Sequence, residues 1–261
     1  MRTAAFFDLD KTIIAKSSAL AFSKPFQAGG LISRRSVLRS AYAQFVYMVG
    51  GADHDQMEKM RQFMSQLTAG WDVATVREIV AETLHHVVDP IVYDEAVGLI
   101  EEHHAAGRDV IIVSTSGADV VEPIGEMLGA DHVVATQMRI EDGHYTGEID
   151  YYAYADAKAE AVRHLAAERG YDLARCYAYS DSVTDVPMLE AVGHPHAVNP
   201  DKELRKVAET AGWPVLVFNR PVNLDKKRLP APGPTITALA VGGAAASVGV
   251  LLWKSWRNRL T

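Results

Sequence analysis

Short apolar runs that alternate with amphipathic helical patterns constrain the fold of this chain more than any other feature of its sequence. Runs typical of buried strands occur at residues 3–9, 109–114, 132–135, 176–179 and 215–218. Helical patterns lie between them at residues 92–104, 119–128, 156–169, 187–191 and 201–211. Strands and helices that alternate at these lengths predict an α/β fold with a doubly wound, mainly parallel sheet.

Two stretches depart from this alternation. Residues 16–91 show helical periodicity without a convincing strand, so we expect a helical cap inserted into a core formed by residues 1–15 and 92–224. Alternating segments on both sides of Asp142-Gly143 predict an antiparallel hairpin appended to the otherwise parallel sheet.

Composition narrows the classes of function. The chain has 48% hydrophobic and 23% charged residues, enough for a sizeable core. Its net charge is −7, and the sequence has no stretch of basic residues interleaved with aromatic residues. Both features argue against a nucleic-acid partner. The single cysteine, Cys176, cannot form an internal disulfide, and we expect it in the core. The N-terminus lacks the pattern of a signal peptide, so we expect the folded domain in the cytoplasm.

Carboxylates gather where two predicted strands end. Asp8 and Asp10 follow the first strand in "DLDKT", and Asp181 and Asp185 follow a later strand in "YSDSVTD". The carboxyl ends of parallel strands share one edge of a sheet, so we expect these side chains to face one crevice. Several carboxylates at one point repel one another unless a cation neutralises them, and a set of oxygen ligands suits Mg²⁺.

Groups that can bind an anion accompany these carboxylates. Ser114 and Thr115 end another strand in "VIIVSTSG", and the turn amides and hydroxyls there can hold a phosphate. Lys158, near the start of a predicted helix, offers a cation. A phosphomonoester fits between such groups and a metal ion, and one carboxylate can then attack phosphorus. The set predicts phosphoryl transfer.

The motifs resemble those of the haloacid dehalogenase superfamily of phosphatases, specifically the phosphoserine-phosphatase-like subfamily with a helical cap. The resemblance covers roughly residues 3 to 218 and includes "FFDLDKT", "VIIVSTSG", the "EDGHYTGEI" hairpin, Lys158 and "AYSDSVTDVPMLEAVGHPHAVNPDKELRKVAETAGWPVL". It implies a phosphomonoester hydrolase in which Asp8 is the nucleophile and Asp10 the general acid/base.

The same resemblance assigns the remaining residues. Mg²⁺ would be bound by Asp8, the Asp10 carbonyl and Asp181. Asp185 would support these ligands without binding the ion directly. Ser114 and Lys158 would hold the phosphoryl group, beside Thr115 in the same loop. Thr12 would brace the loop that follows the nucleophile.

Other positions leave the substrate open. The subfamily typically has a glutamate nine residues after the nucleophile to meet the ammonium group of phosphoserine, whereas this chain has Ser17. Arg34, Arg35 and Arg39 in the cap indicate either a solvated helix edge or a surface that faces anionic lipid. A phosphorylated small molecule such as phosphoserine, and a lipid phosphate such as lysophosphatidate or phosphatidylglycerophosphate, both remain candidates, as does a non-catalytic scaffold.

The end of the chain is apolar. After a basic, proline-rich linker at residues 225–235, residues 236–253 carry no charge and would span about 27 Å as a helix. Trp253 and Trp256, with the basic tail at residues 254–261, resemble an interfacial belt. We expect a single-pass C-terminal anchor in the cytoplasmic membrane, with an alanine-rich tail that does not cross the membrane as the alternative.

Small residues also repeat within this apolar segment. Gly242 with Ala246, and Gly243 with Ser247, share one helical face, which makes a homodimer in the bilayer a further expectation.

Overall fold

The computed structural model describes residues 2–32, 62 and 65–220. The basic cap residues Arg34, Arg35 and Arg39 lie outside the described residues, as do the linker, the apolar segment and the basic tail. In the part of the chain that is described, no helix is both long and apolar enough to cross a membrane.

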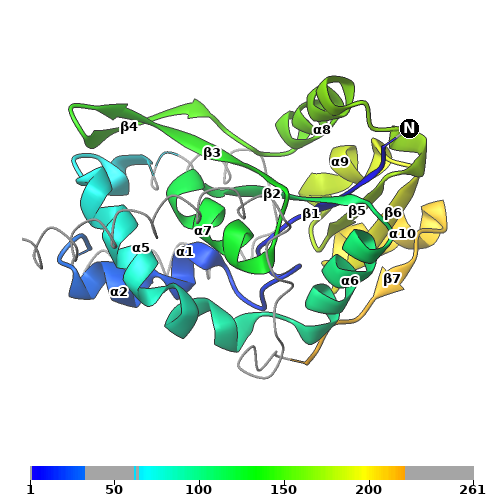
Figure 1. Ribbon diagram of the computed structural model, residues 1–261, viewed down its shortest axis with the longest axis horizontal. Helices are drawn as coiled ribbons and strands as arrows, with labels where there is room; N and C mark the ends of the chain where they lie inside the picture. Colours follow the sequence, from blue (N-terminus) through cyan, green and yellow to red (C-terminus); the bar gives the residue numbers. More distant parts are fainter. Residues whose placement is uncertain (1, 33–61, 63–64, 221–261) are drawn as a thin grey trace, which may run out of the picture. The chain divides into compact units, whose positions relative to one another are not determined.

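A mainly parallel sheet forms the centre of the described fold (Figure 1). Its strand order is β4-β3-β2-β1-β5-β6-β7, and every neighbouring pair is parallel except β3 with β4. The strands are β1 (Ala4–Phe7), β2 (Asp109–Gly117), β3 (His132–Glu141), β4 (His144–Tyr151), β5 (Tyr177–Ser180), β6 (His194–Val198) and β7 (Val215–Leu216). The predicted α/β class with a mainly parallel sheet is confirmed.

Helices cover both faces of this sheet because its central strands are apolar on both sides. In β1, Ala5 and Phe7 pack into a core shared with α5, α6 and α7, whereas Ala4 and Phe6 pack into a second core shared with α8, α9 and α10. The helices are α1 (Ser18–Ala21), α2 (Ser23–Ala28), α5 (Val73–Val88), α6 (Asp94–Ala105), α7 (Ala118–Leu128), α8 (Asp156–Arg169), α9 (Val186–Glu190) and α10 (Lys202–Ala211), with short 3-10 turns η1 (Asp89–Ile91), η2 (Leu173–Arg175) and η3 (Val183–Asp185).

The predicted hairpin is present as β3 and β4. Asp142 and Gly143 join these strands, and both have positive φ angles, of 49° and 77°. Two central residues with positive φ match the right-handed twist of an antiparallel pair, and Asp-Gly adopts this conformation readily. Arg139 on β3 pairs with Glu148 and Asp150 on β4.

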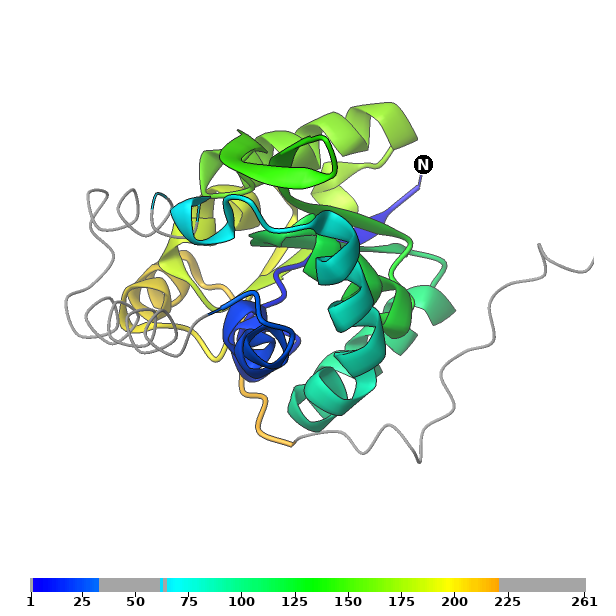
Figure 2. The same cartoon turned by 90° about the vertical axis from the view of Figure 1, so that its left-hand side faces the viewer.

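The described part of residues 16–91 contains the helices α1, α2 and α5 and no strand. Figures 1 and 2 show these three helices, coloured blue and cyan, lying close to one another. Phe26 of α2 packs against Trp71, just before α5. Asp72 caps α5 by accepting a hydrogen bond from the Thr75 amide at 2.7 Å. The exact bounds of the cap stay a prediction.

Strand β6 was missing from the sequence prediction. Its segment, "HPHAV", contains a proline and two histidines, which are not typical of a buried strand. It forms between β5 and β7, and the Ala197 amide donates a hydrogen bond to the Pro214 carbonyl. Pairing with both neighbouring strands stabilises β6 despite its low β propensity.

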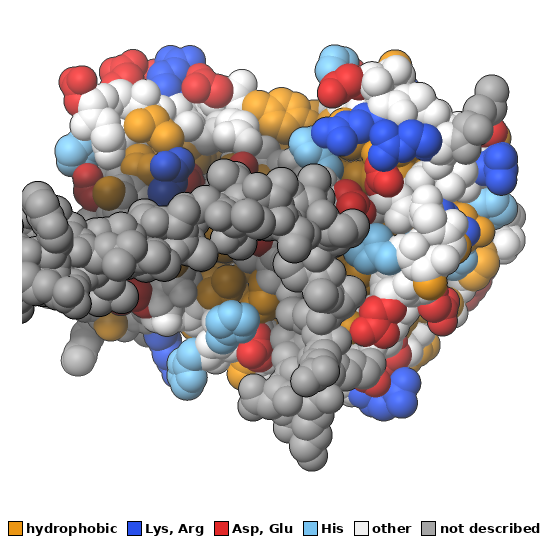
Figure 3. Space-filling model, in the orientation of Figure 1, with side chains coloured by type: hydrophobic (Ala, Val, Ile, Leu, Met, Phe, Trp, Pro, Cys, Tyr) orange, Lys and Arg blue, Asp and Glu red, His pale blue; other side chains and the backbone are white. Residues whose placement is uncertain are grey.

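On the face drawn in Figure 3, acidic and basic side chains of the described residues are interspersed.

Candidate active site

The loop after β1 and the loop after β5 begin side by side. Phe7 pairs with Tyr179 in the parallel register, and the Asp8 amide donates to the Tyr179 carbonyl at 2.9 Å. Asp181 follows β5 directly, so both aspartates lie at the carboxyl edge of the sheet. They are nearly buried, with exposed fractions of 6% and 8%.

Lys158 joins the carboxylates from the first turn of α8. Its Nζ donates to Asp8 Oδ1 at 2.7 Å and to Asp185 Oδ2 at 2.8 Å. Ser180 Oγ also donates to Asp185 Oδ2, at 2.7 Å. Lys158 is 1% exposed; burial disfavours its charge, but the carboxylates of Asp185 and Asp8 outweigh burial and raise its pKa above the ordinary value. It is therefore a fixed cation within the cluster.

The electrostatics of Asp8 and Asp181 show that one lysine does not balance the site. Burial raises the pKa of Asp8 to about 7, Lys158 opposes this rise, and Asp185 adds to it. Burial and the neighbouring Asp8 raise the pKa of Asp181 to about 8. Lys11, in the left-handed conformation with φ 64°, places its Nζ 3.9 Å from Asp181 Oδ2. Ionising both carboxylates together is therefore unfavourable while the two lysines are their only cations among the described residues.

Asp10 is held separately from this cluster. Its Oδ1 accepts a hydrogen bond from the Ser18 amide at 2.8 Å, and its Oδ2 accepts one from Ser116 Oγ at 3.0 Å. Burial raises the pKa of Asp10, and the hydrogen bonds from Ser18 and Ser116 oppose that rise. An aspartate of this kind can carry a proton and release it, as a general acid/base must.

Ser114 and Thr115 lie in the last part of β2, which continues to Gly117 instead of ending at Ser114 as predicted. Ser114 is 1% exposed, and its Oγ accepts from the Ser116 amide at 3.2 Å. The Thr115 hydroxyl donates to the Ala153 carbonyl at 2.9 Å, while Thr136 Oγ1 donates to the Thr115 carbonyl at 2.7 Å. The Thr115 side chain thus ties β2 to the segment that leads into α8 and Lys158.

Thr12 lies in the tight turn after β1, where the amides of Thr12 and Ile13 both donate to the Leu9 carbonyl. Thr12 is fully buried, and among the described residues its hydroxyl has no hydrogen-bond partner. It packs inside the loop that carries the two aspartates.

Three serines of this site had no predicted role of their own: Ser18, Ser180 and Ser116, which was only part of the predicted anion-binding loop. Ser116 stands two residues after Ser114, and Ser180 directly precedes Asp181, so their positions at strand ends were a usable signal. Ser18 had no such signal, because its contact with Asp10 depends on how the chain turns into α1.

The donors at this edge fit the chemistry of Mg²⁺. Carboxylate and carbonyl oxygens are its preferred ligands. Burial first, and neighbouring carboxylates second, raise the pKa values of Asp8 and Asp181, and a bound cation would favour their ionised forms. Among the described residues, no three histidine, cysteine or acidic side chains form a metal cluster. The predicted set has a different composition, with two carboxylates, Asp8 and Asp181, and the carbonyl of Asp10.

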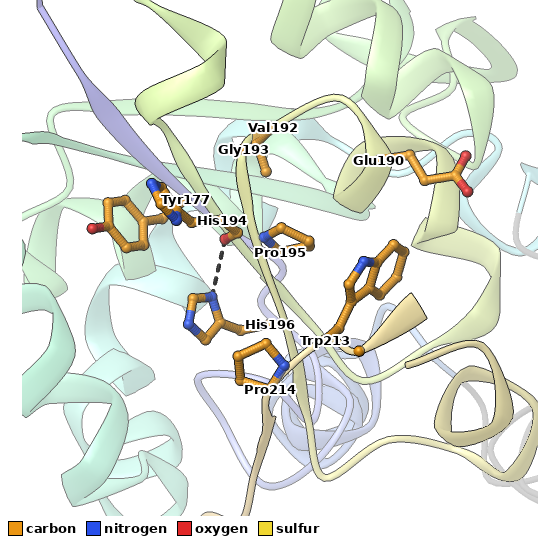
Figure 4. Close-up of a pocket in the computed structure, with 10 residues that line it drawn as sticks. Tyr177, Glu190, Val192, Gly193, His194, Pro195, His196, Trp213 and Pro214 are labelled. Atoms are coloured by element: carbon orange, nitrogen blue, oxygen red, sulfur yellow. Dashed lines mark hydrogen bonds between the residues drawn. The ribbon is translucent and has the colours of Figure 1, made fainter. Parts of the chain in front are cut away.

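A shallow groove of about 500 Å³ lies away from these residues (Figure 4). It forms where β5, β6 and β7 begin, and is lined by Tyr177, His194 and Trp213 among others. In Figure 4, a dashed line joins His196 to the His194 carbonyl, 3.0 Å from the ring Nδ1. The groove is at the amino ends of the strands, so it contains none of the predicted site residues.

Comparisons with known proteins agree with this architecture. The model of the haloacid dehalogenase-like hydrolase family matches residues 5–190. A crystal structure of a Bordetella pertussis protein of unknown function is 31% identical and superposes with a TM-score of 0.72, over 83% of this chain and 98% of that one.

Relatives match almost the whole chain. An "inhibition of morphological differentiation protein" of Streptomyces azureus is 66% identical over 263 residues, 99% of this chain and 95% of the relative. A probable phosphatase of Mycobacterium tuberculosis is 59% identical over 259 residues, 98% of this chain and 90% of the relative. A phosphoserine phosphatase of the same organism is 32% identical over 253 residues, 96% and 80% of the two chains. The chain therefore belongs to the haloacid dehalogenase-like hydrolases.

Proposed function

We propose that this protein is a Mg²⁺-dependent phosphomonoester hydrolase that works through a phosphorylated Asp8. The observation that carries the proposal is the buried contact of Lys158 with Asp8 and Asp185, at 2.7 and 2.8 Å. A carboxylate kept beside a permanent cation suits attack on an anionic phosphoryl group, because the lysine offsets the repulsion between the two anions. The family and the probable phosphatase among the relatives support this chemistry.

The first half-reaction transfers the phosphoryl group to the enzyme. Lys158 donates to Asp8 Oδ1, so we assign the attack on phosphorus to Asp8 Oδ2. As the new P–O bond forms, the bond to the leaving group breaks, and Asp10 gives its proton to the departing oxygen. Ser114 and Lys158 hold the phosphoryl oxygens during the transfer.

The second half-reaction restores the enzyme. Asp10, now a carboxylate, takes a proton from water, and the water oxygen attacks phosphorus. The bond between phosphorus and Asp8 breaks, so inorganic phosphate leaves and the Asp8 carboxylate returns. Mg²⁺, when bound by Asp8, Asp181 and the Asp10 carbonyl, would neutralise charge on the phosphoryl oxygens.

The test replaces the nucleophile with its neutral isostere. Asp8→Asn should abolish phosphate release from 4-nitrophenyl phosphate, while circular dichroism shows that the variant folds. Asp150→Asn, on the exposed side of the hairpin, is the matched control and should keep wild-type activity. Phosphatase activity in Asp8→Asn equal to that of the wild type would refute the proposal, as would a wild type inactive on every phosphomonoester tested.

For the substrate, we propose a phosphorylated small molecule. The 32% identical phosphoserine phosphatase supports this class. Ser17 stands where the subfamily has its glutamate, and a hydroxyl cannot replace a carboxylate opposite an ammonium group, so phosphoserine itself is the member of the class that Ser17 favours least. Steady-state turnover of amino-acid, sugar and other small phosphates, compared with a generic aryl phosphate, identifies the preferred leaving group.

One sequence feature favours a second candidate, a lipid phosphate. Residues 236–253 carry no charge, and we propose that they anchor the protein in the cytoplasmic membrane with the catalytic domain in the cytoplasm. Introducing two arginines, Val241→Arg and Val248→Arg, into this segment should move the protein from the membrane fraction to the soluble fraction. The lipid candidate stands only if the same change also lowers phosphate release from lysophosphatidate vesicles and spares 4-nitrophenyl phosphate.

A further inference from the structure

We infer that Ser116 is a positioning residue that holds the proposed general acid Asp10 in place and links it to Ser18, the first residue of α1. This inference rests on the proposed function, because it concerns the proton that Asp10 gives to the leaving group. The sequence motifs predict phosphate binding by Ser114 and Thr115 but no separate role for Ser116 or Ser18.

Each carboxylate oxygen of Asp10 has its own donor. The Ser18 amide donates to Oδ1 at 2.8 Å, and Ser116 Oγ donates to Oδ2 at 3.0 Å. These donors come from two elements far apart in the sequence, one from the start of α1 and one from the last part of β2. A carboxylate with both oxygens held cannot rotate freely about its terminal torsion, so its proton has a defined direction.

The two donors are also joined to each other. Ser18 Oγ donates to Ser116 Oγ at 2.8 Å, so the hydroxyls form a chain from Ser18 through Ser116 to Asp10. Ser18 is fully buried, although it begins a four-residue helix at the entrance to the predicted cap. The Ser116 oxygen accepts a hydrogen bond from Ser18, and the Ser116 hydroxyl hydrogen is donated to Asp10.

Ser116 is set apart from the phosphoryl-binding group by its own contacts. Its amide donates to Ser114 Oγ at 3.2 Å, while its hydroxyl contacts only Asp10 and Ser18 among the described residues. The amide therefore orients Ser114, and the hydroxyl orients Asp10. Removing the hydroxyl alone should disturb protonation of the leaving group more than binding of the phosphoryl group.

This division predicts a dependence on the leaving group. Phenyl phosphate expels a phenol whose pKa is about 10, and so needs a proton at the moment of departure. 4-Nitrophenyl phosphate expels a far more acidic phenol, which leaves readily as the anion. Ser116→Ala should lower kcat/KM for phenyl phosphate by about 30-fold but that for 4-nitrophenyl phosphate by only about threefold, as expected for partial loss of general acid catalysis.

The experiment measures kcat/KM for a series of substituted phenyl phosphates with the full-length protein. Ser116→Thr keeps the hydroxyl and should restore the wild-type dependence on leaving-group pKa. Ser18→Ala keeps the hydrogen bond from the residue 18 backbone amide to Asp10 and loses only the hydroxyl. The slope of its log kcat/KM against leaving-group pKa should therefore lie between those of the wild type and Ser116→Ala. Ser23→Ala is the matched control, because its exposed hydroxyl donates to the Leu20 carbonyl and does not contact Asp10.

A double-mutant comparison separates positioning from a general loss of structure. In an Asp10→Asn background, Ser116→Ala should produce no further change in slope, because the acid that it positions is already gone. An equal loss for all leaving groups in Ser116→Ala, or a further change in the Asp10→Asn background, would overturn the inference. Either result leaves the proposed function intact, which fails only if Asp8→Asn retains wild-type activity or the wild type hydrolyses none of these phosphates.

Discussion

Two buried polar clusters of different chemistry include residues of strand β5. At its carboxyl end, Ser180 supports the cluster of Lys158 with Asp8 and Asp185, in which charges dominate. Within the strand, Tyr179 belongs to a second cluster, in which His103 of α6 meets the tyrosine hydroxyl at 2.9 Å and accepts from Arg108 Nε at 2.7 Å. Both clusters are buried, but carboxylates meet in the first, whereas aromatic and imidazole rings predominate in the second.

The polar groups of the second cluster pack against aromatic rings and hydrogen-bond to one another. Tyr179 stacks between Phe7 and His196 at centroid distances of 4.4 and 4.8 Å. Burial, helped by Arg108, lowers the pKa of His103 to about 4, so its imidazole stays neutral near neutral pH. The first cluster instead raises the pKa of Asp8 to about 7. Buried polar groups that hydrogen-bond to one another stabilise the fold, whereas carboxylates whose pKa values are raised into the neutral range are typical of a reaction centre.

The largest expected effect comes from removing the fixed cation. Lys158→Met leaves two carboxylates buried without their partner and should lower kcat/KM about 1,000-fold or more, since it also removes a donor to the phosphoryl group. Phosphate release from 4-nitrophenyl phosphate measures this loss. Lys206, whose ammonium pairs with Glu203 on the exposed side of α10, provides the control, and Lys206→Met should keep wild-type activity. Equal activity of the two variants would contradict the charge-based account.

Metal removal should distinguish the two clusters next. EDTA should abolish activity, and added Mg²⁺ should restore it and raise the melting temperature, because the ion binds the folded state and relieves repulsion among the carboxylates. Asp181→Asn should reduce this thermal shift, whereas Tyr179→Phe should leave it unchanged. Calorimetry with and without Mg²⁺ measures it. A shift of the same size in Asp181→Asn would remove that residue from the metal site.

The ring cluster should control stability at acid pH. The folded-state pKa of His103, about 4, lies below the ordinary 6.5, so its stabilising contribution is complete above pH 6.5 and is lost as pH falls towards 4. The loss is at most ~1.4 kcal/mol per pH unit. The groups that face or surround this imidazole are His104, Arg108, Tyr177, Tyr179 and His196. Urea unfolding of the wild type and His103→Gln at pH 7 and 5 measures the difference, and identical pH slopes would contradict this assignment.

The smallest effect is expected for one hydrogen bond of the ring cluster. Tyr179→Phe keeps the stacked ring but removes the hydroxyl 2.9 Å from His103 Nε2, and should destabilise the fold by about 1 to 2 kcal/mol. Activity should not change, because the ring cluster lies inside the fold and away from the reacting atoms. An activity loss larger than the stability loss explains would mean that the clusters are coupled through β5.

The contrast also shows what the sequence could predict. Asp8 and Asp181 could be placed together because parallel strands end at one edge and the motifs fall at those ends, and the family resemblance added Lys158. Strand β6 could not be predicted, since a segment with His194 and Pro195 becomes a strand only through its neighbours. The burial of His103 against Tyr179 could not be predicted either, because it depends on how α6 packs on the sheet. The site roles stay predictions that the variants above can test.

The most direct measurement of the central claim is the mass of the enzyme during turnover. Wild-type protein mixed with substrate and quenched in acid should gain the mass of one phosphoryl group, and peptide mapping should place it on Asp8. Asp10→Asn should accumulate more of this species with 4-nitrophenyl phosphate, because water attack then lacks its base. Phosphate release without any covalent phosphoryl enzyme, or with the group on another residue, would contradict the assignment of Asp8 as the nucleophile.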